Sequence, residues 1–519
     1  MNRNSGNVVW RSLLFNSLVV SGILSFSCDR GFAQITPDDT LGDESSVVNP
    51  RDASSESIDG GAIRGQNLFH SFQEFNVGED RGVYFANPDA ITNIFSRVTG
   101  NDVSNILGTL GVDGAANLYL INPNGIVFGE GASLDVQGSF TATTADGIEF
   151  GEQGFFSVVN PTESVLTISV PLGLQFGSNP GSIINRSFVE DNTGEKVGLQ
   201  VPAGENLTLV GGDVSFEAGE ATAKGGNIEI GGLSAAGTVT FNDDGSLNFP
   251  QDVARTDISL SNAADVDVTG TGGGRVNINA HSLNVEAGES GSSSIRAGIT
   301  ADSTSTEAQA GDISINATDN IIIVDESFVF NQVAPEARGN AGNVSISTIN
   351  LSLSGGGQVG AFATGQGNAG NVTIFTNDLT LSDGARVDTS TFGKGNAGNV
   401  KIRATGNITA DGETSDGLSS GAASSVDAGA VGNAGSVIIS TNNLTLSDGA
   451  RVDTSTFGIG NAGNVKIRAT GNITADGETS AGLSSGAASN VEEFAIGDGG
   501  NISITTNNLT LINGARVDK

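Results

Sequence analysis

One stretch of the chain indicates how the whole chain folds: Leu-Thr-Leu-Ser-Asp-Gly-Ala-Arg-Val-Asp-Thr-Ser-Thr-Phe, at residues 379–392, recurs letter for letter at residues 444–457. A third copy begins at Leu509. Self-similarity at a fixed offset is typical of solenoids, in which each repeat packs only on its neighbours. The offset of 65 residues predicts about three turns of roughly twenty residues in each unit.

A shorter motif marks the steps inside this unit. Gly-Asn-Ala-Gly-Asn-Val begins at Gly339, Gly367, Gly395 and Gly460, and the variant Gly-Asn-Ala-Gly-Ser-Val begins at Gly432. The successive steps are 28, 28, 37 and 28 residues. The repetition therefore covers most of the second half of the chain.

Between these glycines, apolar and polar residues alternate. Examples are Asn-Val-Lys-Ile at residues 399–402, Leu-Thr-Leu at residues 444–446 and Asn-Ile-Ser-Ile at residues 501–504. A period of two puts the apolar residues on one face, which predicts short half-buried strands and not helices. Short strands repeated in this way predict an all-β protein built as a parallel β-helix.

The corners between the strands carry Asp-Gly at residues 383–384 and 448–449 and Asn-Gly at residues 513–514. Glycine adopts the positive φ that tight corners require. Four asparagines also hold equivalent places in their repeats, and their amides either hydrogen-bond from coil to coil as a ladder or each start a turn. They are Asn371, Asn399, Asn464 and Asn501.

Composition and charge narrow the classes of partner. The 519 residues include 75 Gly, 10 Pro and 37% hydrophobic residues, enough apolar surface for a core that glycine interrupts throughout. The formal net charge is -35. Such an excess of negative charge repels phosphate backbones and anionic membrane surfaces, so we expect no nucleic-acid partner.

The start of the chain has the features of an export signal. Arg3 and Arg11 give the chain a basic start. The apolar stretch that follows, at residues 13–26, is too short to span a bilayer. Small residues at positions 31 and 33 predict a signal peptide over residues 1–33. The single cysteine, Cys28, lies inside it, so the mature chain has no disulfide, and no later stretch predicts a transmembrane helix.

The region after the signal is less repetitive and richer in large apolar residues. Phe69, Phe72 and Phe75 are spaced by three, which is compatible with a helical face, but the Gly, Asn and Ser nearby favour strands whose phenylalanines fill the core. We expect a compact domain at residues 34–190 and β-helix repeats at residues 191–519. No polar cap precedes Lys519, so we expect the repeats to be truncated there.

A turn with strong local constraints lies inside this domain. Residues 117–129 read Asn-Leu-Tyr-Leu-Ile-Asn-Pro-Asn-Gly-Ile-Val-Phe-Gly, two apolar strands joined by Asn122, Pro123, Asn124 and Gly125. Proline fixes one φ and favours extended geometry at the residue before it, whereas Asn and Gly tolerate left-handed conformations. These four residues predict a tight turn.

Together with its surroundings, this turn resembles the haemagglutination-activity, or two-partner secretion, domain of filamentous haemagglutinin-like proteins. The resemblance covers roughly residues 34–156 and rests on an ordered set of segments. They are Leu-Phe-His-Ser-Phe-Gln-Glu-Phe-Asn-Val at 68–77, Val-Tyr-Phe-Ala-Asn at 83–87, Ile-Phe-Ser-Arg-Val-Thr-Gly at 94–100, the Asn-Pro-Asn-Gly turn, and Gly-Ser-Phe-Thr-Ala-Thr-Thr-Ala at 138–145.

The resemblance implies a right-handed parallel β-helix of the pectin-lyase-like type and a dedicated outer-membrane β-barrel transporter as partner, reached through the periplasm. It also implies that Asn122, Pro123, Asn124 and Gly125 are the secretion motif, either by shaping a turn for folding or by contacting the transporter. A second family motif, Asn-Pro-Asn-Leu, is absent. The nearest segment is Asn-Pro-Asp-Ala at residues 87–90, which puts a two-motif contact in doubt.

Catalytic chemistry finds little support in the sequence. A polysaccharide lyase or glycoside hydrolase on a β-helix needs converging carboxylates or a base. Arg386, Arg451 and Arg516 repeat in identical contexts, which indicates a structural role. His70 and His281 are far apart and have no cysteine near them in a mature chain, so we predict no metal site. No catalytic or cofactor-binding residues are predicted.

The sequence thus predicts a secreted adhesin-like exoprotein, not an enzyme, at the cell surface or in the medium. Its receptor is expected to be a glycan or a protein on a host or neighbouring cell. Two alternatives remain at this point: a secreted β-helical polysaccharide lyase or glycoside hydrolase, and a structural spacer that lacks its functional tip.

Overall fold

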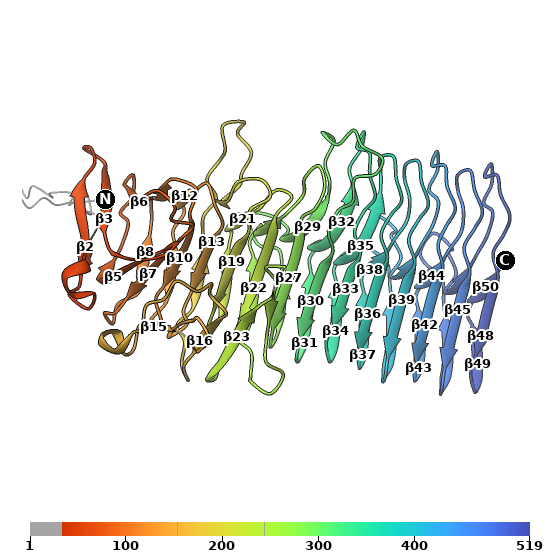
Figure 1. Cartoon of the computed structure of the whole chain (residues 1–519). Helices are drawn as coiled ribbons and strands as arrows, with labels where there is room; N and C mark the ends of the chain where they lie inside the picture. The colour runs from red at the N-terminus through yellow and green to blue at the C-terminus, as the bar shows by residue number, and fades with distance from the viewer. Residues whose placement is uncertain (1–33, 153, 243) are drawn as a thin grey trace, which may run out of the picture.

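The computed structural model describes residues 34–519 except residues 153 and 243. The predicted signal peptide and its cleavage point lie outside the described residues. The chain forms one elongated stack of coils (Figure 1), and its strands are joined by loops and two short 3-10 helices, η1 (Gly42–Glu44) and η2 (Pro161–Glu163). In the described part of the chain, no helix is long and apolar enough to cross a membrane.

The coils build three long sheets, and most coils give one strand to each. The first sheet runs from β1 (Ile35–Pro37) to β48 (Ile502–Thr505), and the second runs from β8 (Ser104–Ile106) to β49 (Asn508–Ile512). The third begins as β2 (Ser46–Pro50) to β12 (Ser133–Asp135) and resumes as β18 (Leu199–Gln200) to β50 (Arg516–Asp518).

Strands from successive coils pair in parallel along all three sheets, which confirms the predicted parallel β-helix. In the first sheet, β39 (Val400–Ala404) pairs in parallel with β36 (Val372–Thr376) on one side and with β42 (Val437–Thr441) on the other. At the N-terminal end the pattern changes, because β1 and β2 pair antiparallel with β5 (Asn67–Phe75) and β3 (Ser55–Gly60).

The predicted subdivision of the 65-residue unit is wrong. Val372 pairs with Val400, Val400 with Val437, and Val437 with Val465, so one unit contains two coils of 28 and 37 residues. Each of these two coils has three strands, and the segments that join the strands account for the residues beyond twenty. Most of the additional length of the 37-residue coil lies in the loop at residues 412–420.

The Asp-Gly and Asn-Gly corners are tighter than predicted. At each of them both residues, and not the glycine alone, have positive φ: 53° and 81° at Asp383 and Gly384, and 49° and 89° at Asp448 and Gly449. Aspartate tolerates this left-handed conformation better than most side chains. The pair therefore turns the chain from the second sheet to the third within a few residues.

The structure shows the asparagine ladder. Asn399 Nδ2 donates to Asn371 Oδ1 at 2.9 Å, and Asn371 Nδ2 donates to Asn343 Oδ1 at 2.9 Å. Each Oδ1 also accepts the backbone N–H of the next coil, as Asn399 Oδ1 does from Ser436 N at 2.9 Å. The ladder is interrupted at Ser436, whose side chain is too short to continue it, and resumes where Asn464 Oδ1 accepts Asn501 N at 3.0 Å.

The repeated glycines are required because the coils nearly touch at this corner. A Cβ atom on Gly367 would lie 1.5 Å from the carbonyl oxygen of Gly339, and one on Gly460 would lie 1.6 Å from that of Gly432. Such contacts exclude every side chain. The glycine of each Gly-Asn-Ala-Gly motif therefore sets the distance between coils, and the asparagine beside it supplies the hydrogen bonds.

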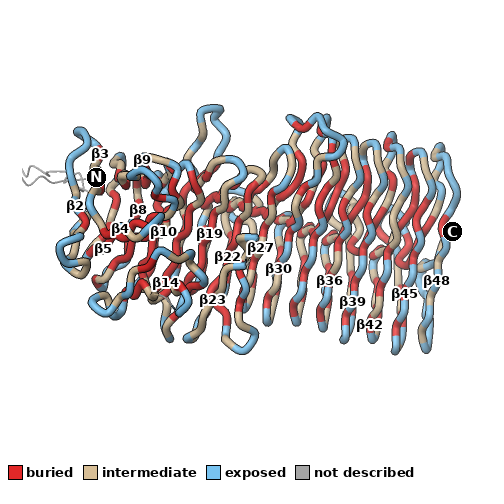
Figure 2. The backbone as a smooth tube through the Cα atoms, viewed as in Figure 1, coloured by how far each residue is buried: buried red, intermediate tan, exposed pale blue. Residues whose placement is uncertain are grey.

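Buried residues run along the whole stack (Figure 2), and their apolar side chains form one continuous core. In β5, Phe72 and Phe75 face this core, which confirms the predicted strand in place of a helical face. Phe69 points to the opposite side of the same strand. Burial of each such side chain contributes about 1.5–3 kcal/mol, so the core supports the whole length of the stack.

A small antiparallel sheet, here called the flap, covers the outer face of the first sheet near its N-terminal end (Figure 1). It was not predicted from the sequence. Under it, Phe69 stacks on Phe95 at 5.2 Å between ring centroids, and Phe95 stacks on Tyr119 at 4.6 Å. The flap strands are β14 (Gly147–Glu149), β15 (Phe155–Ser157), β16 (Gly173–Phe176), β23 (Gly237–Phe241) and β24 (Leu247–Asn248).

The flap also buries a carboxyl group. Glu229 is 1% exposed, and its Oε1 accepts a hydrogen bond from Asn277 Nδ2 at 2.5 Å while its Oε2 accepts the N–H of Leu247 at 3.3 Å. Burial raises the pKa of Glu229 to about 7, and the hydrogen bond from Asn277 offsets only part of this rise. The group therefore titrates near neutral pH.

The interrupted ladder generates the first prediction. We expect Ser436→Asn to stabilise the chain by about 0.5–1 kcal/mol, because the new amide can donate to Asn399 Oδ1 and accept Asn464 N–H. Urea unfolding of the two proteins measures the difference. Ser436→Ala is the control, and a Ser436→Asn chain no more stable than this control would contradict the prediction.

The buried carboxyl group generates the second. The pKa of Glu229 is raised in the folded chain from 4.5 to about 7, so its contribution to stability is complete below about pH 4.5 and is lost as pH rises through 7. We expect Glu229→Gln to be more stable than the wild type by about 1–3 kcal/mol at pH 8.5 and nearly equal to it at pH 5.

Urea unfolding at both pH values tests this expectation. The exposed loop residue Glu307 provides the control variant Glu307→Gln. An equal gain at pH 5 and pH 8.5 would show that the carboxyl charge is not the cause.

Candidate functional site

The predicted secretion motif forms the corner between β10 (Asn117–Ile121) and β11 (Ile126–Phe128). The N–H of Gly125 donates to the carbonyl oxygen of Asn122 at 3.1 Å and closes the turn. Gly125 has a φ of +127°, and a Cβ there would lie 3.1 Å from the carbonyl oxygen of Ser182. The tight turn predicted from the sequence is therefore present.

Asn122 holds this turn against the preceding coil. Its side chain is completely buried, and its Nδ2 donates to the carbonyl oxygen of Asp102 at 2.9 Å and to Ser104 Oγ at 3.0 Å. Its Oδ1 accepts the N–H of Asn124 at 3.0 Å. Because a buried amide without partners is costly, these contacts specify asparagine at this position.

The other motif residues contact both neighbouring coils. Asn124 Nδ2 donates to the carbonyl oxygen of Gly100 at 2.8 Å, and the carbonyl oxygen of Pro123 accepts the N–H of Gly181 at 2.7 Å. A Cβ on Gly181 would lie 2.3 Å from the carbonyl carbon of Asn124. Three coils thus meet at the motif, and Asn124 remains exposed while Pro123 is half-buried.

The segment at residues 87–90 forms a second corner of similar design. Asn87 Nδ2 donates to the carbonyl oxygen of Ile91 at 3.1 Å, and its Oδ1 accepts the N–H of Ala116 in the next coil at 3.1 Å. The N–H of Ile91 closes the turn on the carbonyl oxygen of Pro88 at 3.2 Å. This corner joins the third sheet to the first, so it lies on a different edge of the stack from the secretion motif.

Arg97, on β7 (Asn93–Val98), binds the flap to the stack and was not identified from the sequence as a site residue. It is completely buried, and it donates five hydrogen bonds to residues from four segments. The acceptors are Ser71 Oγ at 2.9 Å, the carbonyl oxygen of Ser157 at 2.5 Å, Ser164 Oγ at 2.6 Å, Thr40 Oγ1 at 2.9 Å and the carbonyl oxygen of Pro161 at 3.1 Å.

The carboxylate of Asp38 and the ring of Phe156 complete this cluster around Arg97, which is here called the Arg97 clasp. Asp38 accepts hydrogen bonds from Thr40, Ser71 and Thr99, and these outweigh the effect of burial and hold the pKa of Asp38 below its ordinary value. The guanidinium lies over the ring of Phe156 at 4.4 Å. Burial lowers the pKa of Arg97 to about 10, so the group remains charged at neutral pH.

The signal that could have identified Arg97 is its neighbourhood. It is a cation in a run of apolar and small residues, Ile-Phe-Ser-Arg-Val-Thr-Gly. Strand alternation places it on the outer face, where an arginine is ordinarily solvated. Only the flap, which is formed by residues more than fifty positions later, makes this place buried.

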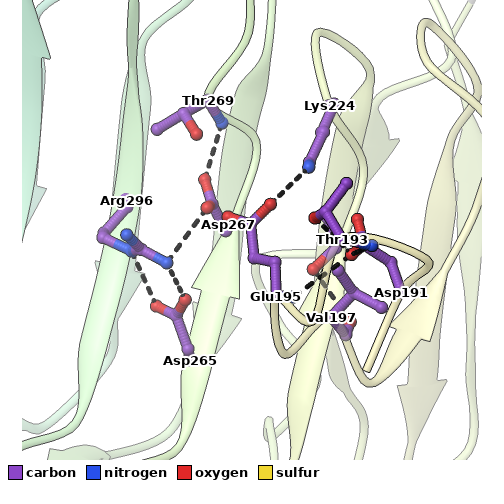
Figure 3. Close-up of polar contacts among 10 residues, drawn as sticks. Asp191, Thr193, Glu195, Val197, Lys224, Asp265, Asp267, Thr269 and Arg296 are labelled. Carbon is purple, nitrogen blue, oxygen red and sulfur yellow. Dashed lines mark hydrogen bonds and ion pairs between the residues drawn. The ribbon is translucent and has the colours of Figure 1, made fainter. Parts of the chain in front are cut away.

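The third sheet carries a group of charged side chains around Arg296 (Figure 3). Arg296 pairs with Asp265, to which it donates a short hydrogen bond, and with Asp267 at 3.0 Å. Burial and the neighbouring Asp265 raise the pKa of Glu220 to about 7. Because Arg296 contacts both aspartates, the carboxylates of Asp265 and Asp267 are engaged in ion pairs.

Figure 3 also shows the loop at residues 191–197 beside this group. Lys224 pairs with Glu195 at 2.8 Å, and Asp191 Oδ1 accepts hydrogen bonds from the hydroxyl and the N–H of Thr193 at 2.6 and 2.8 Å. These contacts fix the loop on the sheet. Asp191, Glu195, Asp265 and Asp267 are therefore all engaged in contacts within the protein.

The structure places the three repeated arginines, Arg386, Arg451 and Arg516, in one row of the third sheet with one strand between neighbours, and it brings neither histidine to this row. Each of the three repeated arginines pairs with an aspartate two residues later on its own strand, which agrees with a structural role. The pairs are Arg386–Asp388 at 3.0 Å, Arg451–Asp453 at 3.2 Å and Arg516–Asp518 at 3.1 Å. His70 is buried in the core, and the exposed His281 lies 2.8 Å from Asp257. Across residues 34–519 without 153 and 243, no three His, Cys, Asp or Glu side chains form a group that could hold a metal ion.

Two curated proteins resemble part of this chain. A heme/hemopexin-binding protein of Haemophilus influenzae (strain ATCC 51907 / DSM 11121 / KW20 / Rd) is 29% identical over 187 residues, which is 34% of this chain and 20% of that protein. A second heme/hemopexin-binding protein of Haemophilus influenzae is 36% identical over 75 residues, 14% of this chain and 8% of that protein. The matched part therefore spans a fifth or less of these relatives.

Two solved structures are also similar. The HMW1 secretion domain from Haemophilus influenzae aligns with a TM-score of 0.44 and 17% identity, covering 92% of this chain and 100% of that domain. The filamentous hemagglutinin secretion domain aligns with a TM-score of 0.30 and 16% identity, covering 71% and 99%.

A comparison with protein families covers both the segments of the sequence resemblance and the N-terminal coils of the fold. A family model described as the TPS secretion domain matches residues 33–278. This range contains every segment of the predicted resemblance, the corner at Asn122–Gly125, the Arg97 clasp and the whole flap. Residues 33–278 of this chain are therefore a TPS secretion domain, the domain to which the haemagglutinin-like segments of the sequence pointed.

Proposed function

We propose that this chain is a non-catalytic, adhesin-like exoprotein that a dedicated outer-membrane β-barrel transporter exports to the cell surface or the medium. The match of residues 33–278 to the TPS secretion domain carries this proposal. In this proposal, the N-terminal half of the chain is the part that the transporter recognises. The repeats that follow hold a binding surface away from the cell, and the receptor is a glycan or a protein.

The coil architecture suits a chain that folds after it has crossed the membrane. Each strand of the repeats pairs with the strand one coil before it, so every emerging coil can dock on a finished edge without an energy source. The single cysteine, Cys28, also excludes intrachain disulfides. Folding outside then opposes return of the chain.

The Arg97 clasp adds a step that depends on chain order. Arg97 lies in an early coil, whereas Ser157, Pro161 and Ser164 are some sixty residues further along the chain. Its donors are therefore satisfied only when the flap has folded back on the first sheet. We propose that this closure completes the folding of the export domain and stabilises the coils that carry the secretion motif.

Within this scheme, we propose that Asn122, Pro123, Asn124 and Gly125 shape the corner on which export depends, and that the exposed edge at Pro123 and Asn124 is the part available to the transporter. The three hydrogen bonds of the buried Asn122 side chain support the first half of this proposal. The exposure of Asn124 supports the second.

The motif generates a prediction about export. We expect Asn122→Ala and Gly125→Ala to leave most of the precursor in the periplasm of cells that express the transporter, measured by fractionation and immunoblotting. The matched control is Asn185→Ala. Asn185 is equally buried, donates to the carbonyl oxygen of Glu220 at 3.0 Å and accepts the N–H of Ser187 at 3.0 Å, but lies outside the motif.

Both asparagine variants should lose about 1–3 kcal/mol of stability, because each removes a buried amide that satisfies neighbouring backbone groups. Normal secretion of Asn122→Ala despite such a loss would contradict a role of the motif in export. Equal retention of Asn185→Ala would show that stability alone, and not the motif, controls export.

The clasp generates a prediction about stability. We expect Arg97→Met to lower the free energy of unfolding by about 2–4 kcal/mol, because it removes a buried cation and its five hydrogen bonds to the surrounding hydroxyl and carbonyl groups. Urea unfolding and the rate of protease cleavage within residues 147–176 measure the effect.

Arg51→Met is the control, since Arg51 pairs with Asp113 at the surface at 2.8 Å and should contribute less than about 1 kcal/mol. If the two variants unfold at the same urea concentration, the flap is held by its apolar contacts alone.

A further inference from the structure

The outer face of the first sheet carries a cluster of cations in the repeats. Lys401 and Arg403 lie on β39, and Lys466 and Arg468 lie on β45 (Val465–Ala469), all four exposed. Register places Lys401 and Lys466 in one row and Arg403 and Arg468 in a second row, with β42 between the two strands. The cluster is therefore a rectangle of about 7 by 10 Å, from the rise along a strand and the spacing between strands.

These cations are not neutralised by the protein. In the described part of the chain, none of the four forms an ion pair, whereas the arginines of the third sheet in the same repeats all pair with aspartates. The six consecutive strands of this face, at residues 344–347, 372–376, 400–404, 437–441, 465–469 and 502–505, contain no Asp or Glu. The acidic residues of the repeats lie on the corners and the other sheets.

The space between the rows is hollowed and partly apolar. A shallow hollow of about 500 Å³ is lined by Lys401, Arg403, Ile438, Ser440 and Arg468, among others. Ile438 is 36% exposed between the two lysines, and Phe375 is 41% exposed beside Arg403. An apolar floor flanked by cations and hydroxyl groups fits the C–H face of a sugar ring and its acidic substituent.

We propose that this face, formed by β39, β42 and β45, binds a linear acidic polysaccharide that lies along the axis of the stack. The proposal names the partner of the surface-presented repeats and so rests on the proposed function. An extended glycan with one carboxylate or sulfate on every second sugar presents charges at an interval of the same order as the two cation-bearing strands. Its rings can rest on Ile438.

Charge density favours this partner over nucleic acid and over a membrane. Duplex DNA carries a charge about every 1.7 Å of its axis, so it would bring many phosphates against a molecule whose net charge is -35. An anionic bilayer is broad and would also meet the acidic corners. A thin polymer with widely spaced charges meets the four cations and little else.

Binding of the purified full-length chain to immobilised hyaluronan, with neutral dextran as reference, tests the proposal. The test variant is K401Q/R403Q/K466Q/R468Q. The control, R338Q/R386Q/K394Q/R451Q, removes the same number of positive charges from corners and from the third sheet. Urea unfolding of both variants confirms that they are folded.

We expect the wild type and the control to bind hyaluronan with an affinity that falls as salt rises, and the test variant to bind about ten- to a hundredfold more weakly, since each of the four exposed charge contacts contributes a factor of about two to three. Three results would overturn the proposal: no preference of the wild type for hyaluronan over dextran, an equal loss in both variants, or tighter binding to duplex DNA or to phosphatidylglycerol vesicles.

Secretion of the test variant separates this proposal from the export function. The substituted residues lie outside residues 33–278, so we expect the variant to be exported like the wild type. Normal export together with absent hyaluronan binding by the wild type would reject the glycan surface and leave the export proposal standing.

Discussion

Each coil of this protein rests directly on the backbone of the coil before it, and most other features follow from how little space this leaves. At the corners the carbonyl oxygen of one coil occupies the place where a side chain of the next would begin, as Gly367 and Gly460 show. Only glycine fits there, and asparagine beside it joins the coils through its amide. Variation is then confined to outward positions and loops, where a surface protein needs it.

The parts of the fold that could be predicted are those that depend on local pattern. Alternation of apolar and polar residues gave the strands around Val400 and Val465, and the repeated motifs gave the direction of stacking. The coil lengths of 28 and 37 residues were already present as the steps between the Gly-Asn-Ala-Gly motifs, but the division of the 65-residue offset into turns of about twenty residues was wrong. Similarly, the pattern at Asp383 predicted a corner but not that the aspartate itself would adopt positive φ.

In the export domain, one feature could be predicted from the sequence and another could not. The turn at residues 122–125 could be predicted because proline, asparagine and glycine each restrict the backbone locally. The environment of Arg97 could not, since its acceptors come from residues 40, 71, 157, 161 and 164. Nothing near Arg97 in the sequence indicates that a flap will cover it. Distant contacts of this kind convert an apparently solvated cation into the centre of a buried network, and the flap was missed for the same reason.

The near-identity of the 65-residue units has a consequence for how such a chain can evolve. Residues 379–392 and 444–457 are identical in sequence, so their coding segments are suited to unequal recombination, which adds or deletes whole units. A unit inserted between two others brings its own glycine contacts and amide bonds and meets the same surface above and below. Length is therefore a heritable quantity that can vary without redesign of the core, and with it the reach of the protein and the number of Lys401-like and Arg403-like positions along one face.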